Sequence, residues 1–305
     1  IARLNLVAMT QAQTGGQAKS SLGGTVGRYQ VSTVTKTNFT PQEDWIIYGS
    51  NSPENVDALR SENLAVVRFS VPTQSQPTKT PHAVLLFDTS ASRGIGFEGR
   101  VDALKTLVNR LDSIGVEKVD VIAFDQAVQP IYSGAPRGFG AAQETALKDR
   151  GALGASNLTR ALKSLKWTGI FERRIIILGD GVITAGETDP TKLTDLISGL
   201  SQSGVKRIDA IVDSTARDST TLTHLVNTLP VRGKILEGRD GMDEQIARLS
   251  RATLGDIKVE VPGARWVWPQ YIKGAQQNDM AVVFADIPSA SALKLNLTGG
   301  TTASF

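Results

Sequence analysis

Oxygen-bearing side chains gather in one short stretch of the chain, directly after a strongly apolar segment. In LLFDTSASRGIGFEGR (85–100), Asp88, Ser90 and Ser92 place a carboxylate and two hydroxyls on alternate residues. Two later segments have the same character: Ser156 lies in GASNL, and Asp180 follows the apolar run RIIIL. Two carboxylates and three hydroxyls are hard oxygen donors, which favour Mg²⁺, with Mn²⁺ or Ca²⁺ as alternatives.

The elements that must position these side chains are apolar strands alternating with amphipathic helices, from His82 to about Ala252. This alternation predicts an α/β domain with a mostly parallel, Rossmann-like sheet covered on both faces. Ligand loops of such sheets lie at the carboxyl ends of the strands, so the three segments are expected to meet at one edge. The expected strands are 83–87, 119–124, 174–179, 207–212 and 234–238, and the expected helices are 101–114, 158–165, 193–200 and 222–229.

The two flanks of this domain have a different texture. Residues 1–80 are rich in Thr, Ser, Gln and Gly, contain β-prone pieces such as 29–34 and 64–71, and end in a linker with three prolines at 72–81. Residues 253–305 return to β-prone pieces at 257–261, 281–287 and 292–297. Short strands bounded by Pro and Gly predict β structure. We expect both flanks to pack together as one β-rich domain, interrupted by an α/β domain at 81–252.

The glycines of GIGFEG (94–99) raise the alternative of a dinucleotide-binding turn. In that turn the first glycine follows the strand almost directly, whereas six residues separate Phe87 from Gly94. The expected acidic residue at the end of the second strand is also misplaced, since Asp120 lies near its start and Asp125 past its end. We therefore expect no nucleotide cofactor and interpret the glycines as a turn into a helix near Arg100.

A hydrolytic role would need a base beside Ser90 or Ser92. The chain has two histidines: His82 precedes the strand whose far end carries the serines, and His224 lies within a predicted helix. The Gly-x-Ser-x-Gly elbow is absent from the sequence. The sequence therefore predicts no catalytic residues and a protein that is not an enzyme.

Composition limits the partners and the compartment. Net charge is only +3, from 33 basic and 30 acidic residues that are scattered along the chain, so no nucleic-acid surface is indicated. No apolar run is long enough to span a bilayer. The absence of cysteine is consistent with an extracytoplasmic location, in the periplasm, on the cell surface or in secretion. Because the chain begins at Ile1 rather than Met, we expect it to be a processed or partial product.

The three oxygen-rich segments resemble the metal-ion-dependent adhesion site of a von Willebrand factor A domain, whose pattern is Asp-x-Ser-x-Ser, then Thr, then Asp. The resemblance implies that Asp88, Ser90 and Ser92 are first-loop ligands, that Ser156 takes the threonine role and that Asp180 contacts the ion directly or through water. The chain departs from the family at Ala91 and Arg93, where glycine and methionine are usual. Arg93 places a cation close to the predicted site.

The flanks at 40–72 and 255–299 resemble the segments beside the A domain in inter-alpha-trypsin-inhibitor heavy-chain-like proteins. The combined resemblance implies a metal-dependent adhesion module that binds an Asp or Glu carboxylate of a protein partner. A structural or assembly subunit of a larger surface complex, with a vestigial metal site, is the alternative.

Overall fold

The computed structural model describes residues 3–11, 23–26, 29–37, 57–74, 76–167, 171–214, 216–289, 291–299 and 303–304. The chain divides into two compact units, residues 1–55 and residues 56–305. The first unit contains a three-stranded antiparallel sheet in the order β1-β3-β2, formed by β1 (Arg3–Gln11), β2 (Gly23–Val26) and β3 (Tyr29–Thr37).

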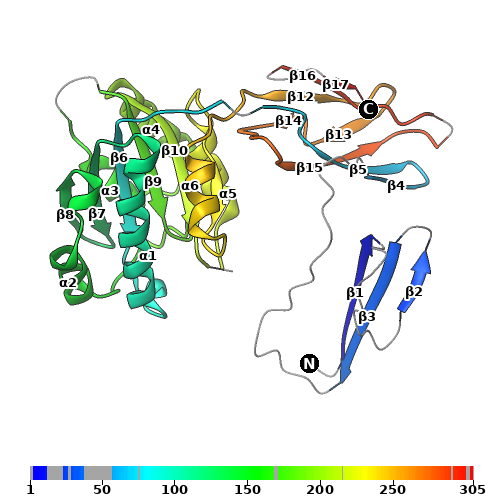
Figure 1. Cartoon of the computed structure of the whole chain (residues 1–305). Helices are drawn as coiled ribbons and strands as arrows, with labels where there is room; N and C mark the ends of the chain where they lie inside the picture. Colours follow the sequence, from blue (N-terminus) through cyan, green and yellow to red (C-terminus); the bar gives the residue numbers. More distant parts are fainter. Residues whose placement is uncertain are drawn as a thin grey trace. The chain divides into compact units, whose positions relative to one another are not determined.

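A six-stranded sheet, with helices on both sides, forms the α/β part of the second unit (Figure 1). Its order is β11-β10-β9-β6-β7-β8, and every neighbouring pair is parallel except β7–β8. Numbered within this domain, the order is 3-2-1-4-5-6 read from β8, which is that of a doubly wound fold. The strands are β6 (His82–Asp88), β7 (Lys118–Phe124), β8 (Val128–Gly134), β9 (Arg173–Leu178), β10 (Val205–Val212) and β11 (Ile235–Glu237).

The sheet has a hydrophobic core on each face, because its central strands alternate between two buried surfaces. In β6, Leu85 and Phe87 belong to one core, and Val84 and Leu86 belong to the other. The first core is covered by α1 (Phe97–Arg110), α2 (Ala141–Arg150) and α6 (Met242–Leu249), and the second by α3 (Leu158–Ser164), α4 (Pro190–Gln202) and α5 (Ser219–Asn227). Short 3₁₀ helices lie at Ala91–Arg93, Leu111–Ile114 and Pro136–Gly138.

The remainder of the second unit is a β-sandwich built from both sides of the α/β domain. Strand β5, before that domain, pairs antiparallel with β15, which follows it. Phe69 and Leu297 are fully buried in the core that the two sheets share. The sheets are β13-β15-β5-β4 and β14-β12-β16-β17. Their strands are β4 (Asp57–Ser61), β5 (Leu64–Ser70), β12 (Ile257–Glu260), β13 (Trp266–Trp268), β14 (Tyr271–Ile272), β15 (Met280–Asp286), β16 (Asn296–Gly299) and β17 (Ala303–Ser304).

The predicted fold class is confirmed: a mostly parallel α/β sheet is inserted between β-rich flanks. One strand was placed wrongly, because the last piece was expected at 292–297 and β16 begins at Asn296. Residues 40–56, part of the first flank resemblance, lie outside the described residues. No helix in the described part of the chain is long and apolar enough to cross a membrane.

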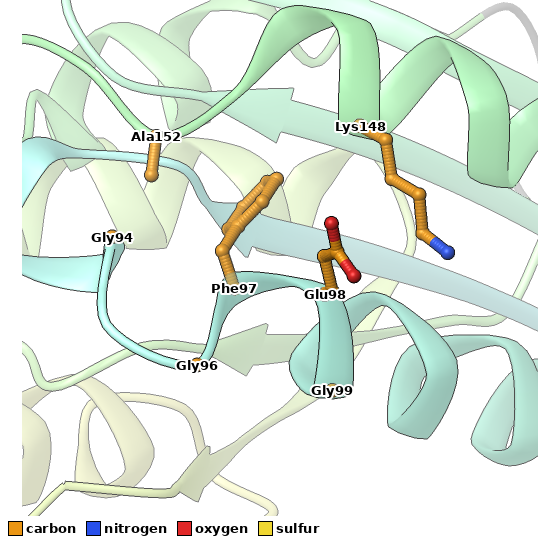
Figure 2. A pocket seen from close by; sticks show the side chains of 7 residues that line it. All are labelled: Gly94, Gly96, Phe97, Glu98, Gly99, Lys148 and Ala152. Carbon is orange, nitrogen blue, oxygen red and sulfur yellow. The ribbon is translucent and has the colours of Figure 1, made fainter.

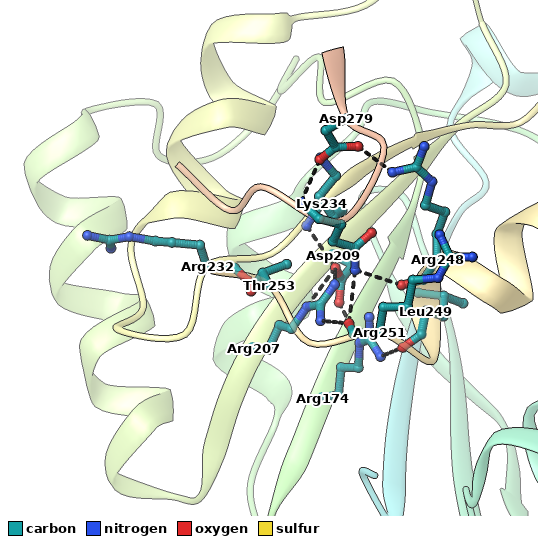
Figure 3. A network of polar contacts seen from close by, with 11 residues as sticks. Arg174, Arg207, Asp209, Arg232, Lys234, Arg248, Leu249, Arg251, Thr253 and Asp279 are labelled. Atoms are coloured by element: carbon teal, nitrogen blue, oxygen red, sulfur yellow. Dashed lines mark hydrogen bonds and ion pairs between the residues drawn. The ribbon is translucent and has the colours of Figure 1, made fainter. Parts of the chain in front are cut away.

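Two adjacent segments join the α/β domain to the sandwich. Thr78 N–H donates to the Ser250 carbonyl (2.8 Å), and Ala252 N–H donates to the Gln76 carbonyl (2.7 Å). Nearby, Asp279 of the sandwich forms ion pairs with Lys234 and Arg248 of the α/β domain (Figure 3). Besides the two chain segments that connect them, hydrogen bonds and ion pairs therefore hold the two parts together.

At the same end of the α/β domain lies a buried carboxylate, that of Asp209, which forms several polar contacts. Asp209 in β10 is fully buried and pairs with Arg174 of the neighbouring strand and with Arg207 (Figure 3). Burial acts to raise the pKa of Asp209, but the two guanidinium groups outweigh it and hold that pKa below its ordinary value. Arg174 also donates to the Leu249 carbonyl, and Arg207 to the carbonyl of Arg251.

Candidate metal centre at the carboxyl edge of the sheet

The predicted site lies where the strand order reverses. From β6 the chain passes to β7 on one side, and β9 lies on the other side. Asp88 is the last residue of β6, and Asp180 follows the end of β9 by two residues. In open α/β sheets, ligands bind in the crevice outside the carboxyl ends of the strands at this switch point. The two acidic residues therefore flank the position that the fold itself favours for a ligand.

In the loop that follows β6, a backbone N–H donates to the carboxylate at the start of the same loop. Ser90 N–H donates to Asp88 Oδ1 (2.8 Å), and a 3₁₀ turn at Ala91–Arg93 follows. This turn brings the Ser90 and Ser92 hydroxyls to 3.2 Å from each other. Asp88 and Ser90 are buried, whereas Ser92 is exposed, so the loop presents one hydroxyl to solvent.

The other two segments join this loop. The Ser156 hydroxyl donates to Asp88 Oδ2 (3.1 Å), and the Ser92 hydroxyl donates to Asp180 Oδ2 (3.5 Å). All five residues expected from the sequence therefore lie in one hydrogen-bonded cluster. The loop that follows β9 is fastened to the same cluster, because Asp180 Oδ1 accepts from Val182 N–H (3.0 Å).

The cluster is electrostatically unfavourable for a second negative charge. Burial, the largest influence, raises the pKa of Asp88, and the nearby charge of Asp180 raises it further. Hydrogen bonds from Ser90 and Ser156 oppose this rise by stabilising the ionised form. A cation between the two carboxylates would relieve the repulsion between them.

Arg93 already supplies one positive charge. Its side chain is buried, with Nη1 3.6 Å from Asp180 Oδ2 and 3.1 Å from Asp213 Oδ1. Arg100 pairs with the second oxygen of Asp213, so this carboxylate holds both arginines. The sequence indicated Arg93 but not Asp213, although Asp213 directly follows β10 at the same edge and could have been found from that position.

A second polar layer anchors the first loop. The Thr89 hydroxyl donates to the Phe124 carbonyl at the end of β7 (3.1 Å) and accepts from Arg150 Nε (3.0 Å). Arg150 also pairs with Asp125 (2.7 Å), the residue after β7. Sequence reasoning missed this layer, because Arg150 lies on α2, a helix that it did not predict.

The oxygen donors of this cluster suit a hard cation, but they supply only two negative charges. Among the described residues no three His, Cys, Asp or Glu side chains come together as a metal cluster, so an ion here would depend on two carboxylates and on hydroxyls. That composition excludes a thiolate or imidazole site and suits Mg²⁺, which binds through few carboxylates and retains waters. Arg93 reduces the negative charge that remains for the ion.

The residues that raised the hydrolase and nucleotide alternatives lie away from the cluster or have a structural role. His82 begins β6, at the opposite end from the serines, and bonds to Asp120 (2.7 Å). The glycine turn enters its helix earlier than expected, because α1 begins at Phe97 rather than near Arg100. Gly96 provides the left-handed backbone (φ 68°) that this start requires.

Comparison with known proteins found similarity in structure but not in sequence families. No protein-family model matches the chain, and neither does any curated protein. A von Willebrand factor type A structure from Catenulispora acidiphila has 16% identity and a TM-score of 0.42, over 83% of this chain and 71% of the other. The ArnB paralog VWA2 from Sulfolobus acidocaldarius has 15% identity and a TM-score of 0.37, over 83% and 74%. Manganese-loaded Plasmodium vivax TRAP protein has 14% identity and a TM-score of 0.42, over 71% and 97%.

Proposed function

We propose that residues 81–252 form a von Willebrand factor A domain that binds a divalent cation, with Mg²⁺ as the first choice, and through it an acidic side chain of a protein partner. The observation that carries this proposal is the convergence of Asp88, Ser92, Ser156 and Asp180, with Ser90, at the switch point of the sheet. These residues come from three chain segments that are far apart in sequence, the loop at 88–92, Ser156 and Asp180, so local turn geometry alone does not explain their meeting. The proposed role is binding rather than catalysis.

Each residue has a distinct part in this arrangement. Asp88 and Asp180 supply the negative charge, and their burial strengthens the electrostatic attraction of a cation. Ser90 N–H orients Asp88, and the hydroxyls of Ser92 and Ser156 hold the carboxylates in place through hydrogen bonds. When bound, the cation supplies an electrophilic position that a carboxylate from outside the chain completes.

Isothermal titration calorimetry with MgCl₂ and MnCl₂ tests the metal directly, without a partner. We expect saturable binding to the full chain that is lost in Asp88→Ala. Asp195→Ala is a matched control, because Asp195 is an exposed aspartate on α4. Equal heats for the chain and for Asp88→Ala would refute the metal site. Affinity capture of partners with and without EDTA then tests whether binding depends on the cation.

A structural or assembly role in a larger complex is the second candidate. The position of Arg93 favours it, because a guanidinium 3.6 Å from Asp180 partly replaces the charge of a metal. In that case the chain would bind no Mg²⁺, and Arg93→Ala would loosen the site without changing partner capture. In both cases we infer an extracytoplasmic protein, with the sandwich as a stalk related to the flanks of inter-alpha-trypsin-inhibitor heavy-chain-like proteins.

A further inference from the structure

A cleft of about 480 Å³ opens on the β-sandwich, and it shares no residue with the candidate metal centre. Strands β13 and β14 are terminal strands of the two sheets, and β12 lies beside β14 (Figure 1). The residues that line the cleft come from these three strands and the turns between them. Those with an aromatic ring or a polar side chain are Lys258, Glu260, Trp266, Gln270 and Tyr271, and we call this site the aromatic cleft.

Two aromatic side chains leave about half of their surface exposed at the cleft. Trp266 in β13 and Tyr271 in β14 are each 47% exposed. Strand β13 explains the position of Trp266, because Val267 packs against the core of the sandwich and its two neighbours therefore face outwards. The second neighbour, Trp268, is 63% exposed, packs against Phe284 and is not part of the lining. Since tryptophan is highly buried on average, exposed rings of this kind mark a surface that meets another molecule.

Polar groups lie beside these rings. Alternate residues of β12 are buried, so Lys258 and Glu260 both project away from the core, and Tyr271 is paired directly opposite Lys258. The Lys258 Nζ atom is 2.5 Å from Glu260 Oε1, and no other described residue of the lining is charged. Val259 N–H donates to the Gln270 carbonyl (2.9 Å), which holds the backbone of Gln270 against β12. The cleft therefore combines donors and acceptors without a net charge.

The hollow of about 590 Å³ that follows the first ligand loop offers no comparable surface (Figure 2). Gly94, Gly96 and Gly99 form much of its lining. Among the described residues that line it, the one aromatic side chain is Phe97, which is only 9% exposed and belongs to the core of the α/β domain. The aromatic cleft differs because its rings are accessible and stand next to polar groups.

The lining of the cleft selects an uncharged ligand with apolar faces and hydroxyl groups at its edges. Flat aromatic rings pack against a flat apolar face, while Lys258 donates, Glu260 accepts and the Gln270 amide does both. A proline-rich segment has apolar faces but no backbone N–H for the carboxylate, and a lipid chain has neither donors nor acceptors. A hexose ring meets both requirements, because C–H groups occupy its faces and each of its hydroxyls donates and accepts.

We propose that the aromatic cleft binds a neutral hexopyranose unit of a glycan. The sugar ring stacks on Trp266 and Tyr271, and its hydroxyls donate to Glu260 and accept from Lys258 and Gln270. Lys258 and Glu260 are both exposed, so their ion pair is weak and is exchanged for sugar hydroxyls at little cost. This inference does not depend on the proposed function, and it gives the sandwich a binding role of its own.

Tryptophan fluorescence and calorimetry on the full chain test the site, with oligosaccharides of glucose, galactose, mannose and N-acetylglucosamine as probes. The titrations are made in EDTA, which removes cation-dependent binding at the candidate metal centre. We expect saturable binding of at least one probe, weakened at least about tenfold (about 1.4 kcal/mol) by Trp266→Ala and by Tyr271→Ala. Trp268→Ala is the matched control, because Trp268 is an exposed tryptophan of the same strand outside the lining, and its affinity should be unchanged.

A further variant keeps the test valid if removal of a ring disturbs folding. Glu260→Gln changes only an exposed side chain and should weaken binding about fivefold, because a charged acceptor is replaced by a neutral one. Melting temperatures of all variants are compared with that of Trp268→Ala, so that a loss of binding is separated from a loss of folding.

The outcomes decide between a sugar and other ligands. If no oligosaccharide binds, or if Trp266→Ala and Glu260→Gln bind as tightly as Trp268→Ala, the sugar site is overturned. Tighter binding of sialylated or sulfated oligosaccharides, of a polyproline peptide or of phosphatidylcholine vesicles also overturns it, because each assigns the cleft to another class of ligand. None of these results affects the candidate metal centre, which is tested separately with MgCl₂.

Discussion

Replacing Asp209 with alanine should destabilise the α/β domain more than any surface charge substitution. Asp209 is fully buried and accepts hydrogen bonds from Arg207 Nε (2.9 Å) and from Lys234 N–H (2.8 Å), in addition to its pair with Arg174. The side chains of Arg174 and Arg207 are each only 5% exposed. Asp209→Ala therefore leaves two buried cations without their shared counter-ion.

The size of the effect follows from this burial. Breaking a buried ion pair by removing one partner costs about 3–5 kcal/mol, because the remaining charge stays buried and uncompensated. For a domain of this size each kcal/mol lowers the melting temperature by about 2–4 °C. We therefore expect the melting temperature of Asp209→Ala to fall by roughly 6–20 °C.

Thermal unfolding followed by circular dichroism, together with urea unfolding, measures this loss. Asp256→Ala provides the control at the same junction, because Asp256 pairs with Arg232 but its side chain is 31% exposed. A partly exposed pair of this kind contributes about 0–1 kcal/mol. If Asp209→Ala unfolded within about 2 °C of Asp256→Ala, the reasoning about uncompensated buried charge would be refuted.

Three further predictions concern the site, the pH dependence and the sandwich. Arg93→Met should tighten Mg²⁺ binding about tenfold in calorimetry, because it removes a cation 3.6 Å from Asp180; unchanged or weaker binding would contradict this. Burial acts to raise the pKa of Asp120, but hydrogen bonds from His82 and Ser133 prevail and lower it from 3.8 to about 2. Its stabilising contribution is therefore complete above pH 3.8 and lost as the pH falls towards 2, and in acid titrations Asp120→Asn should lack that component. Phe69→Ala should cost about 3–5 kcal/mol in urea unfolding, since this side chain is fully buried between the sheets, and a loss below about 1 kcal/mol would contradict the shared core.

The central strands could be predicted because they are buried on both faces. All seven residues of β6 are buried, and its middle five, 83–87, appear in the sequence as a continuous apolar run. Strand β8 gives no such signal, because it is an antiparallel edge strand that has no buried residue and contains Pro130. Helix α2 was missed for a similar reason, since Leu147 is its one fully buried residue.

The candidate ligands could be predicted because each lies just after an apolar strand or just before a helix, where the fold brings loops to one edge. Their immediate surroundings could not. The pairing of Arg93 with Asp213 joins residues 120 positions apart and depends on how β10 is placed relative to β6. A single sequence shows residue types along the chain, and it does not show which distant charges will come within a few ångströms.

The double connection between the α/β domain and the sandwich has a mechanical consequence. The segments at 76–78 and 250–252 lie side by side and are hydrogen-bonded to each other, and the first leads into the amino end of β6. The candidate site is at the opposite, carboxyl end of that strand. Tension applied by a partner held at the site is therefore divided between two covalent segments, and it reaches the sandwich on both β5 and β12 rather than through a single linker.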